Sequence, residues 1–273
     1  MHPALEADLF TAANHTYAIC AYGDSPYLQD CIQSLVNQTS RSSILLATST
    51  PSDYISSLCD RFGIQVHVNP GPGGIAGDWN FAVSQARTEL VTIAHQDDVY
   101  LPTYTEEMLG ALNGTKNPTL YFTDYGELRD AGRVDDSRFL NIKRALLFPL
   151  RSGFLSKFRF VRRRCLSLGD PICCPSATLL KARIEEPLFQ ANYGSDLDWE
   201  AWEKLANLKG SFVYNPKVLM LHRIHEESET SRLIEDGERS QEDLSMLAHF
   251  WPKPVAKAIN HLYSTGQASN TLS

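Results

Sequence analysis

The fold is decided by Val91-Thr92-Ile93-Ala94-His95-Gln96-Asp97-Asp98-Val99-Tyr100-Leu101-Pro102, where a run of strand-forming residues ends at two adjacent carboxylates. Adjacent side chains of an extended segment point in opposite directions, so one carboxylate can face a metal while its neighbour faces another group. Ligands of open α/β sheets bind beyond the carboxyl ends of the strands. Oxygen ligands suit Mg²⁺ or Mn²⁺ shared with a substrate phosphate. The alternative interpretation is a solvated loop, or a helix cap at Asp98, and a loop-end carboxylate should contribute little to the core.

Strand and helix patterns alternate through the N-terminal part of the chain. Buried strands are expected at residues 17–22, 44–47, 64–68 and 90–94. Apolar residues recur at helical spacing in residues 27–38 and 75–87, and a further helix opens near Pro51 with Ser49 or Thr50 as its cap. Alternation with short links predicts an α/β fold with a mostly parallel central sheet flanked by helices.

The second part of the chain is less regular. Strands are expected at residues 120–128, with a bulge at Gly126, and at 212–214 and 218–221, and residues 172–180 are expected to be a turn that leads into a further core strand. Ser195 and Asp198 have the spacing of a capping pair at the start of a helix. One face of this helix is apolar and is formed by Trp199, Trp202, Leu205 and Ala206. Residues 231–264 form a helical C-terminal extension interrupted at 251–254, and residues 265–273 are expected to be a disordered tail.

Composition limits the class of protein. The 273 residues, 43% of them hydrophobic, can bury a full core, and the net charge of −7 argues against a nucleic-acid partner. None of the six cysteines lies in a Cys-x-x-Cys pair, which predicts reduced thiols and no structural zinc. The first 15 residues lack a signal-peptide pattern, and no apolar run approaches the roughly 20 residues that cross a bilayer. We therefore expect a cytoplasmic protein.

Residues 137–169 contain no acid, although the chain as a whole is acidic. The segment carries nine basic residues: Arg138, Lys143, Arg144, Arg151, Lys157, Arg159, Arg162, Arg163 and Arg164. Leucine and phenylalanine side chains are interleaved with them. Two interpretations remain open. Residues 138–164 could lie on the inner face of an anionic plasma membrane or against an anionic acceptor, or they could form a helical packing face with solvated arginines.

Six segments, in order along residues 17–228, resemble family 2 glycosyltransferases of the GT-A fold. The matching segments are Ala18–Asp24, Cys31–Thr39, Gly77–Ala82, Gln96–Pro102, Asp198–Ala206 and Arg223–Ser228. The resemblance implies a glycosyltransferase domain at 1–230, with a nucleotide-sugar half at 16–102 and an acceptor half at 103–230. Residues 231–264 then form the helical extension.

The same resemblance implies roles for individual residues. Asp98 would bind Mn²⁺ or Mg²⁺ with His225 as a second ligand, and His222 is the rival of His225. Asp198 would be the general base, and Asp196 is its rival. The nucleotide-sugar donor would be bound by Ala21, Tyr22, Asp24, Asn80 and Asp97.

The implied reaction is an inverting, hexosyltransferase-type transfer. The sugar would move from a nucleotide-diphosphate sugar to a hydroxyl of a glycan or lipid-linked acceptor, in the synthesis of cell-wall or other surface polysaccharide. The chain departs from the family pattern at three positions. His95 stands where many members have the first Asp of the metal motif, Leu197 stands where many have Glu before the base, and Thr48 stands where an Asp commonly reads uracil.

These departures keep two other functions open. A metal-dependent phosphohydrolase would account for the grouping of His95, Asp97, Asp98 and His225 along the sequence, although the chain lacks further carboxylates at two-metal spacing. A non-catalytic sugar-nucleotide-binding module would tolerate the changes at His95, Leu197 and Thr48. Release of a nucleoside diphosphate, release of phosphate, or donor binding without turnover distinguishes the three.

Overall fold

The computed structural model describes residues 9–225 and 239–268 of the chain. Its first four strands are all parallel and lie in the order β3-β2-β1-β4. They are β1 (His15–Ala21), β2 (Ser43–Thr48), β3 (Gln65–Val68) and β4 (Leu90–His95). The connecting helices are α1 (Leu28–Val36), α2 (Asp53–Phe62) and α3 (Ile75–Gln85). The predicted strand–helix alternation is therefore confirmed, with small shifts at the element ends.

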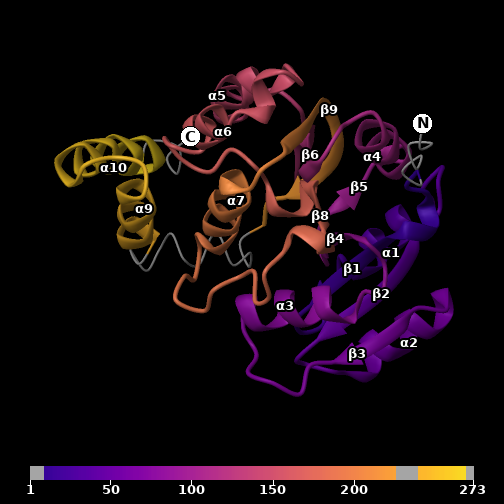
Figure 1. The fold of residues 1–273 in the computed structure, drawn as a ribbon. Helices are drawn as coiled ribbons and strands as arrows, with labels where there is room; N and C mark the ends of the chain where they lie inside the picture. The colour runs from indigo at the N-terminus through magenta and orange to yellow at the C-terminus, as the bar shows by residue number, and fades with distance from the viewer. Residues whose placement is uncertain (1–8, 226–238, 269–273) are drawn as a thin grey trace, which may run out of the picture.

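The sheet continues through strands of mixed direction, and its full order is β3-β2-β1-β4-β8-β6-β9-β5 (Figure 1). β8 (Ala177–Leu180) is antiparallel to both β4 and β6 (Pro118–Arg129), and β6 is parallel to β9 (Ser211–Arg223). The short strands β5 (Val99–Tyr100) and β7 (Gly132–Val134) pair antiparallel with β9 and β6. The result is an α/β fold built on one sheet that is flanked by helices.

Separate cores cover the two faces of the sheet. Successive side chains of a strand point to opposite faces, so Ala18 of β1 joins one core while Tyr17 and Ile19 join the other. The core with Tyr17 is completed by α1, α2 and α4 (Tyr104–Asn113). The core with Ala18 is completed by α3, α7 (Leu197–Asn207), α9 (Arg239–Ala248) and α10 (Lys253–Ala268). The remaining helices, α5 (Arg138–Leu147) and α6 (Arg159–Cys165), lie at the end of the molecule away from α2 and β3 (Figure 1).

Two predicted caps are wrong. Helix α2 is capped by Ser52, whose Oγ accepts a hydrogen bond from the Ile55 N–H at 3.2 Å. The expected caps are engaged elsewhere, because the Ser49 hydroxyl donates to Asp78 at 2.8 Å and Thr50 Oγ1 accepts from the Gly23 N–H at 2.7 Å. Ser195 does not form a capping pair with Asp198, since the N-cap of α7 is Asp196 and the Ser195 hydroxyl donates to Glu242.

Two strand predictions are also corrected. The residues expected as two late strands form the single strand β9, because the chain passes the break at Pro216 through a register shift rather than a turn. The register of β6 against β9 shifts between Pro118 and Leu120 and on both sides of Asp124, and not at Gly126. A Cβ at Gly126 would lie 2.4 Å from Asp135 Oδ1, so the end of the Asp135 side chain would have to shift.

The remaining expectations concern cysteines, membrane spans and the chain end. All six cysteines are free thiols, as predicted, and four of them are buried. Within the described residues, no helix combines the length and the apolar character needed to span a bilayer. Helix α10 reaches Ala268 and so includes the first part of the range 265–273 that is predicted to be a disordered tail. Residues 269–273 and residues 226–238 lie outside the described part of the chain.

Candidate active site

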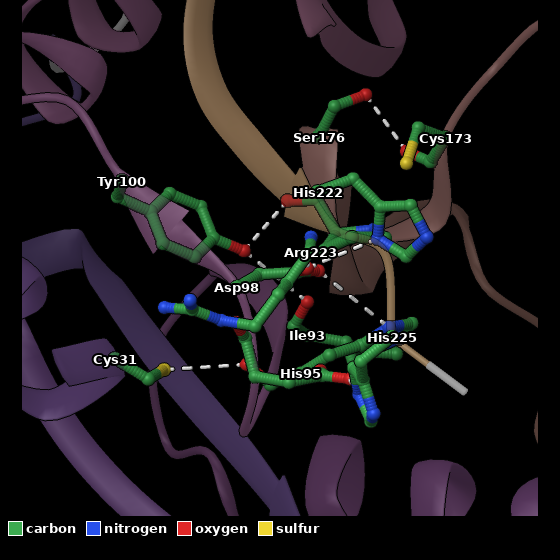
Figure 2. A network of polar contacts seen from close by, with 12 residues as sticks. Cys31, Ile93, His95, Asp98, Tyr100, Cys173, Ser176, His222, Arg223 and His225 are labelled. Atoms are coloured by element: carbon green, nitrogen blue, oxygen red, sulfur yellow. Dashed lines mark hydrogen bonds and ion pairs between the residues drawn. The ribbon is translucent and has the colours of Figure 1, made fainter. Parts of the chain in front are cut away.

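The candidate site lies where β4 and β9 end beside each other, and Figure 2 shows Asp98, His95, His222 and His225 gathered there. Asp98 is fully buried. Its Oδ1 accepts a hydrogen bond from the Arg223 N–H at 2.9 Å and lies 3.0 Å from His222 Nδ1. The expectation that this carboxylate contributes little to the core is therefore wrong, because removal of the side chain would strand two buried donors. Burial opposes protonation of His222, but Asp98 outweighs it and raises the pKa of His222 above its ordinary value.

The second oxygen of Asp98 faces His95. Asp98 Oδ2 lies 3.8 Å from His95 Nδ1, which is too long for a hydrogen bond. Among the described residues, Asp98 Oδ2 and His95 Nε2 are both buried and have no hydrogen-bond partner. Ligand atoms of His95, Asp97 and Asp98 lie within 4.8 Å of one another. Two carboxylates and an imidazole suit Mn²⁺ or Mg²⁺, and the unpaired buried oxygen of Asp98 is the atom that such an ion would satisfy.

The carboxylate of Asp97 is paired with His225. Asp97 Oδ2 lies 3.0 Å from His225 Nε2, so the predicted ligand His225 is paired with Asp97, while its rival His222 is paired with Asp98. Burial would raise the pKa of the Asp97 carboxyl, but the charges of His95 and His222 and the hydrogen bond with His225 hold that pKa below its ordinary value. Asp97 is therefore ready to act as an anion.

Arg223, the last residue of β9, contacts Asp97 and two residues at the start of α1. Its Nε donates to the Asp97 carbonyl at 2.8 Å, and its guanidinium lies 4.3 Å from the centre of the Tyr27 ring. One guanidinium nitrogen also contacts Asp30 at 3.3 Å. The segment that resembles the family's histidine-bearing motif is thus tied both to α1 and to the turn after β4, although its last residues, 226–228, are not described.

The predicted donor-binding turn follows β1 and adjoins the cluster. The side-chain amide of Gln96 exchanges hydrogen bonds with the backbone of Tyr22, at 3.2 Å to its N–H and 3.0 Å to its carbonyl. Ala21 is buried at the strand end, whereas the Tyr22 ring is exposed. Asp24 accepts a hydrogen bond from the Ser52 hydroxyl, which ties the turn to α2. The turn therefore presents an exposed aromatic ring, and its backbone is held by the residue before Asp97.

Two other predicted positions have internal partners. Thr48 is fully buried, and its Oγ1 accepts from the Thr50 N–H at 3.0 Å. The nearby carboxylate is Asp78 of α3, which accepts hydrogen bonds from Ser49 and Asn69, both at 2.8 Å. Asn80, a predicted donor-binding residue, uses its amide to bind the backbone of Phe189 at 2.8 and 3.1 Å. Asn80 thus holds a loop on α3 and does not join the carboxylate cluster.

The predicted base lies in the first turn of α7 and has a carboxyl neighbour that the sequence analysis missed. Asp198 Oδ1 accepts a hydrogen bond from the Trp199 N–H at 2.9 Å, and Asp198 shares a side-chain hydrogen bond with Asp170. Burial first, and then the charge of Asp198, raise the pKa of Asp170 well above its ordinary value. Two carboxyl groups that share a hydrogen bond must hold a proton between them.

Cys173 lies near Asp170 and Asp198 and also near Asp98 of the His95, Asp97 and Asp98 cluster. Burial raises the pKa of the Cys173 thiol, and Asp98, Asp198 and Asp170 raise it further because all three lie close enough to repel a thiolate. Asp98 and Asp198 are therefore both near Cys173. The apolar face of α7 is buried as predicted, with Trp199 2% and Trp202 1% exposed, which fixes the first turn that carries Asp198.

Comparison with known families gives one match. The sequence model described as Glycosyl transferase family 2 matches residues 16–189, which include Asp97 and Asp98 and end before Asp198. A search of curated proteins found no significant match.

Solved structures share the fold at low identity. S. aureus TarS has a TM-score of 0.55 at 14% identity, over 90% of this chain and 42% of TarS, so the chain spans less than half of that protein. The TarS fragment 1–349 in complex with UDP-GlcNAc has a TM-score of 0.61 at 12% identity, over 90% of this chain and 70% of the fragment. The mannosyltransferase PcManGT from Pyrobaculum calidifontis, in complex with GDP-Man and Mn²⁺, has a TM-score of 0.57 at 15% identity, over 95% of this chain and 73% of that one. The GT-A fold expected from the sequence is confirmed by these neighbours.

Proposed function

The chain belongs to glycosyl transferase family 2, and from this premise we propose that it moves a sugar from a nucleotide-diphosphate sugar to an acceptor hydroxyl, with inversion at the anomeric carbon. One observation carries the proposal for this site: the buried Asp98 has one oxygen that is held by β9 and a second that lacks a hydrogen bond and faces His95. An oxygen of this kind at a strand end is suited to a cation that a diphosphate shares.

Asp98, Asp97 and His95 would hold the divalent ion, and His225 would steer Asp97 through their hydrogen bond. A bound Mn²⁺ or Mg²⁺ supplies charge neutralisation to the departing nucleoside diphosphate. The donor would lie along the turn of Ala21, Tyr22 and Asp24. Thr48 and Asp78 are engaged internally, so the recognition of the base would differ from the common uracil pattern, and uridine and guanosine donors are both test ligands.

Asp198 would take the proton of the acceptor hydroxyl. As the acceptor oxygen bonds to the anomeric carbon, the bond from that carbon to the diphosphate oxygen breaks on the opposite face, and the diphosphate leaves with its electron pair. The single displacement inverts the anomeric configuration. Asp170, protonated through its hydrogen bond with Asp198, would keep the Asp198 carboxylate aimed while the proton moves.

The proposed acceptor is a hydroxyl of a glycan or lipid-linked saccharide in the synthesis of surface polysaccharide or another glycoconjugate. Its side of the site is formed by the residues after β5, including Cys173 and the first turn of α7. Residues 138–164 lie outside the candidate site, so a peripheral contact with an anionic membrane through them would not depend on this reaction.

The test is a thermal-shift panel of uridine and guanosine diphosphates and their sugars, with Mn²⁺, Mg²⁺ or EDTA. A ligand at 100 times its dissociation constant should stabilise the protein by about 2.7 kcal/mol. The donor that binds is then supplied with saccharide acceptors, and NMR gives the anomeric configuration of the product. Release of nucleoside diphosphate with inversion supports the proposal. Phosphate release from simple esters, or donor binding without turnover of any acceptor, would contradict it.

A further inference from the structure

Four phenylalanine side chains stand exposed on one short part of the fold. Phe148, Phe154, Phe158 and Phe160 are 65, 66, 47 and 69% exposed, which is unusual for the most apolar aromatic residue. They belong to η2 (Phe148–Arg151), η3 (Leu155–Lys157), the start of α6 and the turns between them. Phe154 and Phe158 pack edge to face, with ring centres 5.1 Å apart. A cluster of exposed apolar rings marks an interaction site more often than it occurs by chance on a monomer.

The segment that carries these rings is held firmly from beneath. Leu147, Leu150 and Leu166 are buried in the core on the inner side of the segment. Arg162 is 1% exposed and donates hydrogen bonds to five backbone carbonyls, among them Ser156 at 2.9 Å and Gly210 at 2.6 Å. The aromatic rings are therefore presented by a fixed scaffold and do not turn inward to bury themselves.

The nine basic residues of the segment divide into two sets. Four are engaged by the protein: Lys143 lies over the Tyr125 ring, Arg144 pairs with Asp124 at 3.2 Å, Arg162 is buried, and Arg163 pairs with Glu203. The other five are exposed, and none forms an ion pair with an acid in the described part of the chain: Arg138, Arg151, Lys157, Arg159 and Arg164. Two of these five also lie over aromatic rings, Arg151 over Phe148 and Arg164 over Phe160 and Trp251, and remain exposed there. The packing interpretation from the sequence therefore describes the first set of side chains, and the second set is left exposed.

The charge of the rest of the chain has the opposite sign. The nine basic residues here leave 16 of the chain's 25 to offset all 32 of its acids. An anionic surface would therefore repel most of the molecule and attract this end. In Figure 1, α5 and α6 lie together at this end, away from α2 and β3.

We propose that this end of the molecule binds an anionic lipid bilayer, with the four phenylalanine rings entering the headgroup region and the five exposed cations contacting lipid phosphates. Arginine beside aromatic rings suits the boundary between water and lipid. A soluble polyanion offers no apolar compartment, so it would leave the rings exposed to water, and for this reason the bilayer is the better fit. The inference does not depend on the proposed sugar transfer, because it concerns residues outside the candidate site.

The test is co-sedimentation of the full chain with vesicles of phosphatidylcholine, or of phosphatidylcholine mixed with phosphatidylglycerol, over a range of salt. We expect binding to the anionic vesicles only, weakening as salt screens the charges. Arg151→Gln with Arg159→Gln should weaken binding about fivefold per charge removed. Phe154→Ser with Phe160→Ser should weaken it further in a way that salt does not change.

Matched controls lie at the far end of the molecule. Arg41→Gln with Arg61→Gln removes the same charge, and Tyr54→Ser with Val68→Ser removes exposed apolar groups of α2 and β3. These pairs should leave vesicle binding unchanged. The proposal is overturned if anionic vesicles do not bind the protein, or if both sets of variants bind equally. It is also overturned if soluble polyphosphate competes completely while the phenylalanine variants bind like the parent, because a polyanion site would then explain the surface.

Discussion

The carboxylate of Glu242 accepts hydrogen bonds from both the backbone N–H and the hydroxyl of Ser195, each at 2.8 Å. It also accepts from the N–H groups of Gly194 at 2.7 Å and Asp196 at 3.1 Å. Three successive backbone donors before α7 therefore converge on one side chain of α9. Because Asp198 lies in the first turn of α7, the C-terminal extension holds the turn that carries the predicted base.

Glu242→Gln should destabilise the protein by about 1–3 kcal/mol, because a neutral amide accepts fewer and weaker hydrogen bonds than a carboxylate. Burial disfavours the charge, but the backbone donors and the Ser195 hydroxyl outweigh it and lower the pKa of Glu242 below the ordinary 4.5. A carboxyl with a lowered folded-state pKa stabilises above its unfolded pKa and loses that contribution as pH falls through the folded value. The difference between parent and variant should therefore be full at neutral pH and shrink below pH 4.5.

Urea unfolding across a pH series measures this difference, and Glu185→Gln, a change at an exposed glutamate, is the matched control. If Glu242→Gln and Glu185→Gln have the same free energy of unfolding at neutral pH, the hydrogen bonds from residues 194–196 to the Glu242 carboxylate contribute nothing to stability. If the Glu242 difference persists unchanged in acid, its charge is not the cause.

Asp98→Asn should abolish the Mn²⁺-dependent binding of nucleoside diphosphates while it leaves the fold intact. The amide oxygen can still accept from the Arg223 N–H, but the second oxygen is replaced by an NH₂ group that cannot bind a cation. Asp98→Ala should lose about 1–3 kcal/mol of stability as well, because buried donors of His222 and Arg223 are left unpaired. Thermal shift with and without EDTA measures both effects, with Asp53→Asn in α2 as control. Equal nucleotide affinity in parent, Asp98→Asn and EDTA-treated protein would exclude the metal site.

Arg162→Lys should destabilise the protein by about 3 kcal/mol or more, since an ammonium group cannot replace a planar fork that reaches several carbonyls. The guanidinium binds Ala206 and Leu208 where α7 ends and Gly210 beyond it, at 2.6 to 3.1 Å. Arg159→Lys on the exposed side of α6 should change stability by less than about 0.5 kcal/mol. Urea denaturation compares the two. If both variants have similar urea midpoints, the hydrogen bonds of the buried Arg162 guanidinium are not needed for stability.

Residue spacing in the sequence predicts those features of the fold that depend on local periodicity. The apolar face of α7 and the strand end at Asp97 and Asp98 follow from residue spacing alone, and both are confirmed. His95 also carried a signal, because it takes the first place of the family's metal motif, and its ring does lie beside Asp98. Two strands were predicted where the structure has the single strand β9, because Asn215-Pro216-Lys217 is typical of a turn. Pairing with β6 instead continues the strand through a bulge.

The long-range partners could not be predicted in this way. Asp170 and Glu242 meet the turn before α7 from loops and helices far along the chain, and no spacing rule relates them to Asp198. Composition likewise identifies a basic segment but does not separate the buried Arg162 from the exposed Arg159. Such pairings depend on tertiary packing, which a single sequence does not encode locally.

Asp170→Asn should remove a pH-dependent loss of stability. Burial and the neighbouring Asp198 raise the pKa of Asp170, so the folded state holds a proton that the unfolded state releases above 3.8. A carboxyl with a raised folded-state pKa costs nothing below its unfolded pKa and destabilises progressively as pH rises toward the folded value. Asparagine can still accept from the Ile172 N–H and can donate to Asp198 without ionising. Urea unfolding should show a variant more stable than the parent at neutral pH, with the gap closing toward pH 3.8. A parent that is the more stable at neutral pH would contradict the shared proton.

Asp198→Asn should leave donor binding nearly intact and lower turnover by about 10²–10⁴-fold, because the amide keeps the shape of the side chain and cannot take a proton. The rival, Asp196, is the N-cap of α7 and is buried, whereas Asp198 is partly exposed. Asp196→Asn should therefore affect stability more than turnover per folded molecule.

The decisive measurement is single-turnover transfer at saturating donor, normalised to folded protein, for Asp198→Asn, Asp196→Asn and Asp170→Asn. If Asp198 is the base, its variant loses the chemical step at every pH. The Asp170 variant keeps most of that step, because its amide can still donate to Asp198. A loss confined to Asp196→Asn, with Asp198→Asn fully active, would move the assignment to Asp196. An equal loss in Asp170→Asn and Asp198→Asn would instead mean that the proton is taken by the pair, and that neither carboxyl acts as the base alone.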